Sequence, residues 1–72
     1  MAPLREELKK ALSDALDKRR RDDTLEAAVG REVRRAGLRY QDYLDLMENV
    51  RTIARKDKLD PWKAAQVLLE EQ

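Results

Sequence analysis

The chain has 72 residues, of which 43% are charged and 42% hydrophobic, and its formal net charge is +1. It contains neither Cys nor His, which removes the usual nucleophile, general base and zinc ligands, so we expect no enzymatic activity and no cofactor. No apolar run approaches the ~20 residues of a membrane span and no secretory leader is evident, which favours a cytoplasmic protein with a single domain over residues 1–72.

The first predicted helix spans residues 3–21. Pro3 is favourable in the first turn of a helix, and Glu6 and Glu7 follow it where the helix dipole prefers negative charge. The basic run Lys18–Arg21 stands at the other end, where the dipole prefers positive charge. The apolar side covers an arc of roughly 140° and consists of Leu4, Leu8, Ala11, Leu12, Ala15 and Leu16.

A second helix is predicted over residues 24–36, after a short polar break in which Asp23 or Thr24 can act as its N-cap. Gly37 is the expected C-cap, and Leu38 supplies the apolar contact that accompanies a Schellman ending. The apolar side of this helix consists of Leu25, Ala28, Val29, Val33 and Ala36, with Glu32 placed among them.

The third predicted helix covers residues 39–56 and is central, because the other helices are expected to pack against it. Its apolar residues span about half of the circumference, whereas a surface helix needs a stripe only a little over ~100° wide. They are Tyr40, Tyr43, Leu44, Leu46, Met47, Val50, Ile53 and Ala54. The opposite side, expected to face water, carries Gln41, Asp42, Asp45, Glu48, Asn49 and Thr52. Both tyrosines and Trp62 are expected to pack in the core, since a buried ring with a solvated polar tip is common.

The last predicted helix covers residues 61–70 and begins at Asp60-Pro61, an N-cap followed by proline at the first helical position. Val67 lies off its apolar side, which consists of Trp62, Ala65, Leu68 and Leu69.

Gly30, inside the second helix, either permits a close helix crossing or marks a weak point in that helix. Four amphipathic helices joined by short turns predict an all-α fold, a compact four-helix bundle.

The amount of apolar surface makes a non-enzymatic protein–protein interaction module our leading functional hypothesis, because a domain of this size buries such surface poorly alone. The apolar residues expected to be left over for a partner are Leu46, Ile53 and Val67. They would bind a second copy of the chain in a two-fold homodimer that completes the bundle, or a helix of another protein. The sequence leaves both partners open, and it indicates no small-molecule substrate.

A small DNA-binding regulator is the alternative hypothesis, because the stretch Lys18–Arg39 holds eight basic residues against four acidic ones. The segment Gly30–Met47, with the sequence GREVRRAGLRYQDYLDLM, begins within this basic stretch and resembles a helix-turn-helix. One helix ends at Ala36-Gly37, an apolar Leu38 stands in the turn, and a second helix follows. Nucleic-acid contacts are then expected from Arg31, Arg34 and Arg35, on the side of the second helix opposite its apolar stripe. Arg39 and Gln41, at the start of the would-be recognition helix, would add to them.

Two physical arguments place DNA binding second. A recognition helix lies against phosphates on both walls of the major groove, and here it would expose Asp42, Asp45 and Glu48 to them. The basic cluster also has a structural explanation, in which its charges match helix ends and form pairs one helical turn apart. The expected pairs are Asp14 with Lys18 and Glu32 with Arg35.

Overall fold

The computed structural model describes residues 4–71 of the chain. Within this range the chain forms no β-strand and four α-helices: α1 (Glu6–Asp17), α2 (Leu25–Arg35), α3 (Tyr40–Asp57) and α4 (Pro61–Glu71). The predicted all-α four-helix bundle is confirmed, and three of the helices begin and end within one residue of the predicted bounds. Pro3, expected in the first turn of the first helix, lies outside the described residues.

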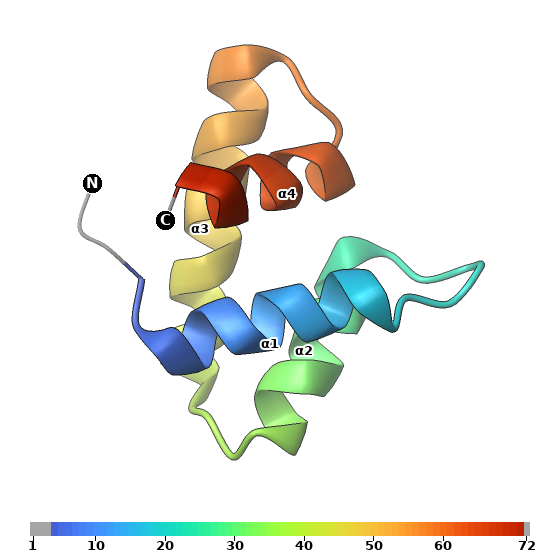
Figure 1. Ribbon diagram of the computed structural model, residues 1–72, viewed down its shortest axis with the longest axis vertical. Helices are drawn as coiled ribbons and strands as arrows, with labels where there is room; N and C mark the ends of the chain where they lie inside the picture. Colours follow the sequence, from blue (N-terminus) through green and yellow to red (C-terminus); the bar gives the residue numbers. More distant parts are fainter. Residues whose placement is uncertain (1–3, 72) are drawn as a thin grey trace.

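The helices cross one another more than they run side by side. In Figure 1, α4 and α1 lie across two different parts of α3, and α2 packs beside α1. The most extensive contacts join α1 to α2 and α3 to α4. The resulting molecule is flat, with extents of 30 × 30 × 18 Å. All four helices contribute to one core, whose fully buried large side chains are Leu12, Leu25, Leu46, Met47, Leu68, Val29 and Val50.

Helix α3 touches each of the other three helices, as its broad apolar side predicted. The residues it buries are Leu46, Met47, Val50 and Ile53. On the polar side, Asp45, Glu48 and Thr52 are exposed as expected. Asp42 differs, because its carboxylate accepts a hydrogen bond from the Arg39 backbone N–H at 3.0 Å and pairs with Arg5. Asp42 therefore caps the start of α3 and is only partly exposed.

Helix α1 is shorter than the predicted range of residues 3–21. It ends at Asp17, directly after its last apolar residue, and the basic run Lys18–Arg21 lies in the connection to α2. In that connection the Arg20 backbone N–H donates to the Asp23 carboxylate at 2.8 Å. No apolar residue stands between Leu16 and Leu25, so a longer α1 would bury no further apolar surface. The cations therefore fold into a loop.

The N-caps of α2 and α4 follow the sequence signals. Thr24 Oγ1 accepts a hydrogen bond from the Ala27 N–H at 3.1 Å, so Thr24, and not Asp23, caps α2. Asp60 Oδ1 accepts a hydrogen bond from the Lys63 N–H at 3.1 Å at the start of α4. Each cap satisfies a backbone donor that the helix itself leaves unpaired.

The turn between α2 and α3 is the predicted Schellman ending. Gly37 has a φ of +74°, its N–H donates to the Arg34 carbonyl at 3.1 Å, and the Leu38 N–H donates to the Val33 carbonyl at 3.0 Å. Leu38 packs against the core as the accompanying apolar contact. This turn sets the angle between the end of α2 and the start of α3, which together form the site described below.

We predict opposite effects of alanine at the two glycines. Gly37→Ala should destabilise the domain by about 1 kcal/mol or more, because φ at this position is positive. Gly30→Ala should stabilise it by about 0.5–1 kcal/mol, because alanine favours the helix. An added Cβ at Gly30 would lie 3.7 Å from the Tyr43 ring, an ordinary contact distance. Urea unfolding of both variants measures the two signs, and destabilisation by Gly30→Ala would contradict the open geometry at that position.

Candidate functional site

A groove of about 970 Å³ lies between α2 and the start of α3. Its lining combines small residues, which leave room, with apolar and aromatic residues, which supply contact surface. These are Ala27, Gly30 and Val33 from α2, Leu38 from the turn, and Tyr40 and Tyr43 from α3. The groove is open to solvent along α2, and its charged lining residues are Glu26, Arg31, Arg34 and Arg35.

Tyr40 is the most exposed large apolar side chain among the described residues, at 72% of its surface. Its ring stacks on that of Tyr43, with centroids 5.7 Å apart and planes 22° apart. The prediction that both tyrosines lie in the core is wrong for Tyr40 and only partly right for Tyr43, which is half-buried. Tyr40 is the first residue of α3 and directly follows the α2–α3 turn. Leu44, one turn further on, is also 37% exposed.

Tyr43 forms the wall of the groove opposite Gly30. Its partial burial raises the pKa of its phenol above the usual value of 10.0, and the negative charge of Glu26 raises the pKa further. The hydroxyl is therefore uncharged at neutral pH and can donate a hydrogen bond to a ligand. An aromatic wall with a neutral donor suits an apolar ligand that carries an acceptor.

The charges along the groove are unevenly distributed. Glu26 lies in the first turn of α2, whereas Arg34 and Arg35 lie in its last turn. Both arginines are exposed, and neither side chain forms a hydrogen bond or ion pair with another part of the described chain. Arg31, between the two ends, is half-buried and paired with Asp23 at 2.8 Å. The free positive charge of the groove is therefore concentrated next to the α2–α3 turn.

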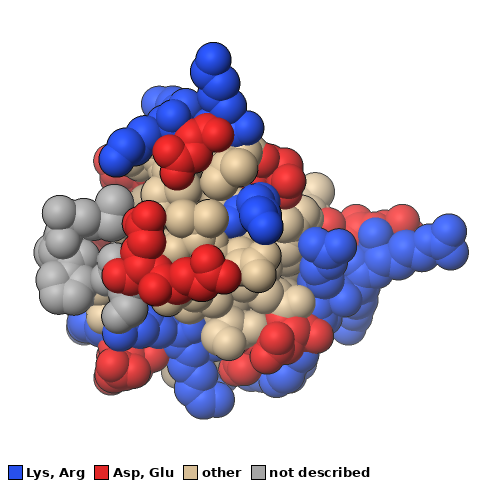
Figure 2. All heavy atoms as spheres, turned by 45° about the horizontal axis from the view of Figure 1, so that its top comes forward, with Lys and Arg blue, Asp and Glu red and all other residues tan. Residues whose placement is uncertain are grey.

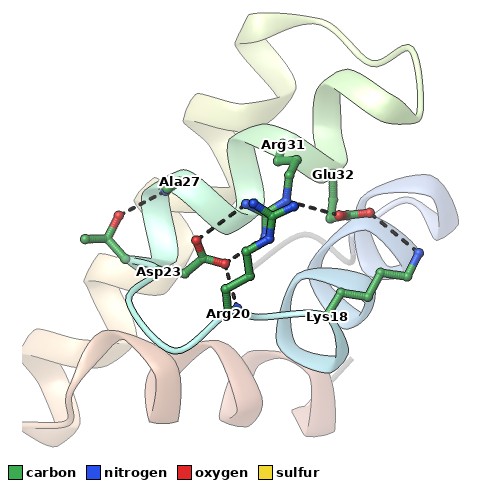
Figure 3. A network of polar contacts seen from close by, with 7 residues as sticks. Lys18, Arg20, Asp23, Ala27, Arg31 and Glu32 are labelled. Carbon is green, nitrogen blue, oxygen red and sulfur yellow. Dashed lines mark hydrogen bonds and ion pairs between the residues drawn. The ribbon is translucent and has the colours of Figure 1, made fainter.

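Arg31 belongs to an ion-pair network that joins α2 to the loop before it (Figure 3). Glu32 is buried, at 3% exposure, and its two carboxylate oxygens lie 3.9 Å from Lys18 Nζ and 3.8 Å from Arg31 Nε. The hydrogen bonds donated by Arg31 hold the pKa of Asp23 below its usual 3.8, and the same contact raises the pKa of Arg31. The network holds the Arg31 side chain toward Asp23 in the loop before α2.

These ion pairs differ from the predicted ones. Glu32 pairs with Lys18 and Arg31 rather than with Arg35, and Asp14 pairs with Lys10, at 3.5 Å, rather than with Lys18. The spacing of residues along one helix could not show that the loop between α1 and α2 brings Lys18 next to Glu32. As a result Arg35 is exposed and has no ion-pair partner within residues 4–71.

The predicted partner-binding residues are not exposed in the way we expected. Leu46 and Ile53 are buried in the core, at 0% and 4% exposure, because α1, α2 and α4 together cover that part of α3. Val67 is half-buried and packs against the core. The expectation that Leu46 and Ile53 are left over for a partner is therefore wrong. The apolar surplus lies instead at the start of α3, around Tyr40.

Of the predicted nucleic-acid residues, Arg34, Arg35, Arg39 and Gln41 are exposed near the α2–α3 turn, and Arg31 is held by Asp23. A second basic region, Lys18–Arg21, lies in the α1–α2 loop, where Lys and Arg atoms gather at the right-hand edge of the face drawn in Figure 2.

The Arg19 guanidinium in this loop lies 4.7 Å from the centre of the Trp62 ring. Half-buried Trp62 thus contacts this loop as well as the core.

Comparisons with known proteins give no match: no protein-family model, no curated protein and no solved structure is similar to this chain. Within residues 4–71, no group of three or more His, Cys, Asp or Glu side chains is arranged to hold a metal ion. The same range contains no helix with the length and apolar character needed to cross a membrane.

The Asp23–Arg31 pair predicts a specific pH dependence. A lowered pKa means that Asp23 stabilises the folded state above its unfolded pKa of about 3.8 and loses this contribution as the pH falls below that value. Asp23→Asn should therefore lower the melting temperature at pH 7, and the difference from the unsubstituted chain should shrink below pH 4. Asp22→Asn, at an exposed neighbour, is the matched control. A difference that is the same at pH 3 and pH 7 would contradict the assignment.

Proposed function

We propose that this chain is a non-enzymatic protein–protein interaction module that binds a partner polypeptide in the α2–α3 groove. The observation that carries the proposal is the stacked pair of Tyr40 and Tyr43, with Tyr40 72% exposed at the edge of the groove. Tyrosine is enriched where protein partners meet, and an aromatic pair held in one orientation loses little entropy on binding. The small, exposed Ala27, which also lines the groove, leaves room for a partner side chain next to this pair.

A partner other than a second copy fits the site better. The core closes within one chain, so the fold needs no dimer to cover residues such as Leu46. A two-fold axis at the groove would also bring Arg34 and Arg35 close to the same residues of the other copy. These exposed like charges would repel across the interface. A homodimer through this surface is therefore disfavoured.

Site-specific crosslinking tests the proposal. A photoreactive benzoylphenylalanine in place of Tyr40, in cells that make the protein, should give a discrete heavier adduct because its ring lies at the groove. The same group in place of Arg55, exposed near the other end of α3, is the control and should give none. The adduct should disappear when Ala27→Trp fills the groove, since Ala27 is exposed and tolerates a larger side chain.

Equal labelling at both positions, or an adduct that survives Ala27→Trp, would contradict docking at the groove. An adduct of twice the mass of the chain would identify the occupant as a second copy.

DNA binding is the second candidate function, and one observation favours it. Helix α2 ends in a tight turn directly followed by α3, and Arg34, Arg35 and Arg39 are exposed together around this turn. Asp45 and Glu48 are exposed on the following turns of α3, where they would face phosphates. Docking of a polypeptide therefore ranks first.

A salt titration separates the two candidates. If these three arginines each contact a phosphate, the log–log slope of affinity for nonspecific duplex DNA against salt should be about −2.7, at about 0.9 per contact. Our proposal predicts no measurable duplex binding at low salt. A steep slope that flattens in the Arg34→Gln/Arg35→Gln double variant would favour DNA binding.

A further inference from the structure

Resting on the proposed function, we infer that the partner segment is a short amphipathic helix whose acidic side chains lie at the end of the groove next to the α2–α3 turn. Three features support this inference: the shape of the groove, the distribution of free charge along it, and the secondary structure that surrounds it.

The shape of the groove fits a helix. Ala27, Gly30 and Arg34 are spaced by three and four residues, so they lie on one side of α2 and form a shallow channel along it. Because Ala27 is exposed and its side chain is small, the backbone of a partner can approach α2 closely there, beside the place where the Tyr43 ring packs over Gly30. From Ala27 to Arg34 the channel is about 10 Å long, which corresponds to about two helical turns.

The surrounding structure also favours a helical partner over an extended one. The described residues contain no β-strand, so they offer no sheet edge to which an extended peptide could add. Two helices that diverge from a tight turn accept the ridge of a third helix between them. The apolar stripe of that helix would meet Leu38, Tyr40 and Tyr43, which line the α3 side of the groove.

The exposed charges along the groove determine at which of its ends the acidic side chains of the partner bind. Among the described residues, Arg34 and Arg35 at the turn end have no ion-pair partner, and Arg31 in the middle is neutralised by Asp23 at 2.8 Å. Glu26 lies at the opposite end, eight residues before Arg34 and about 12 Å away along the helix. Carboxylates on the partner are therefore attracted to the turn end and repelled from the Glu26 end.

The test uses three synthetic helical peptides of about 14 residues, or about four turns. They share one apolar stripe of leucines and differ at one end, which carries two Glu, two Gln or two Lys. Binding is followed by chemical-shift changes in the labelled chain. We expect the Glu peptide to bind at the groove about tenfold more tightly than the Lys peptide at low salt. A nitroxide at the acidic end should broaden the signals of Arg35 and Leu38 more than those of Glu26.

Charge reversal provides the matched pair of variants. Arg34→Glu/Arg35→Glu should switch the preference to the Lys peptide, because the free charge at the turn end changes sign. Arg55→Glu/Lys56→Glu makes the same change in net charge at exposed positions near the other end of α3, and it should leave the preference unchanged.

The outcomes separate this inference from the proposed function. Equal affinity for the Glu and Lys peptides would overturn the inference about charge. If none of the three peptides binds the groove but Tyr40 still forms a crosslink in cells, the inference of an acidic helical partner is wrong. The proposal that a partner docks in the groove would then stand. Tighter binding of a single-stranded oligonucleotide than of the Glu peptide would overturn both.

Discussion

Burial of one side of α3 under three shorter helices is the interaction on which the rest of the structure depends. Leu46, Met47, Val50 and Ile53 are inaccessible to solvent or nearly so, and burial of side chains of this size stabilises a fold by about 1.5–3 kcal/mol each. The covering helices are shorter than α3, which has 18 residues, so they protect only part of its length. Within the first turn of α3, Tyr40 is 72% exposed, whereas Asp42 pairs with Arg5 and Tyr43 packs against the core.

The second constraint is the way in which α2 is held next to the first turn of α3. The left-handed Gly37 directs the chain from α2 into α3, and the buried Glu32 with Lys18 and Arg31 fixes α2 to the preceding loop. In the same network the positive charge of Arg31 is paired with Asp23 and Glu32 and is not available to a ligand. Arg34 and Arg35, one turn further along, have no such partner within the described residues, so the groove is polarised along its length. The contacts that stabilise the fold thus also determine which charges are available to a ligand.

Local sequence signals predicted the elements well and their long-range partners poorly. Thr24, Gly37 and Asp60 act within a few residues of themselves, so the bounds of α2, α3 and α4 and the Schellman turn could be predicted. The end of α1 could not, because it depends on how Asp23 folds back onto the loop. Periodicity showed which side of α3 is apolar, but not how far the other helices extend along it, so Tyr40 was assigned to the core and Leu46 and Ile53 to an interface. The groove depends on how α2 lies against the start of α3, and the pairing of Glu32 depends on how α1 packs against α2. Neither packing can be read from a local sequence pattern.

The central claim is that Tyr40 is open to solvent in the isolated chain while Tyr43 supports it from the groove. Photochemically induced nuclear polarisation measures this most directly, because the chain contains only two Tyr, one Trp and no His that can respond. With the two signals assigned from Tyr40→Phe and Tyr43→Phe variants, Tyr40 should be strongly polarised and Tyr43 weakly. A Tyr40 signal as weak as that of Tyr43 in dilute solution would show that both rings are covered, and it would contradict an open aromatic groove between α2 and α3.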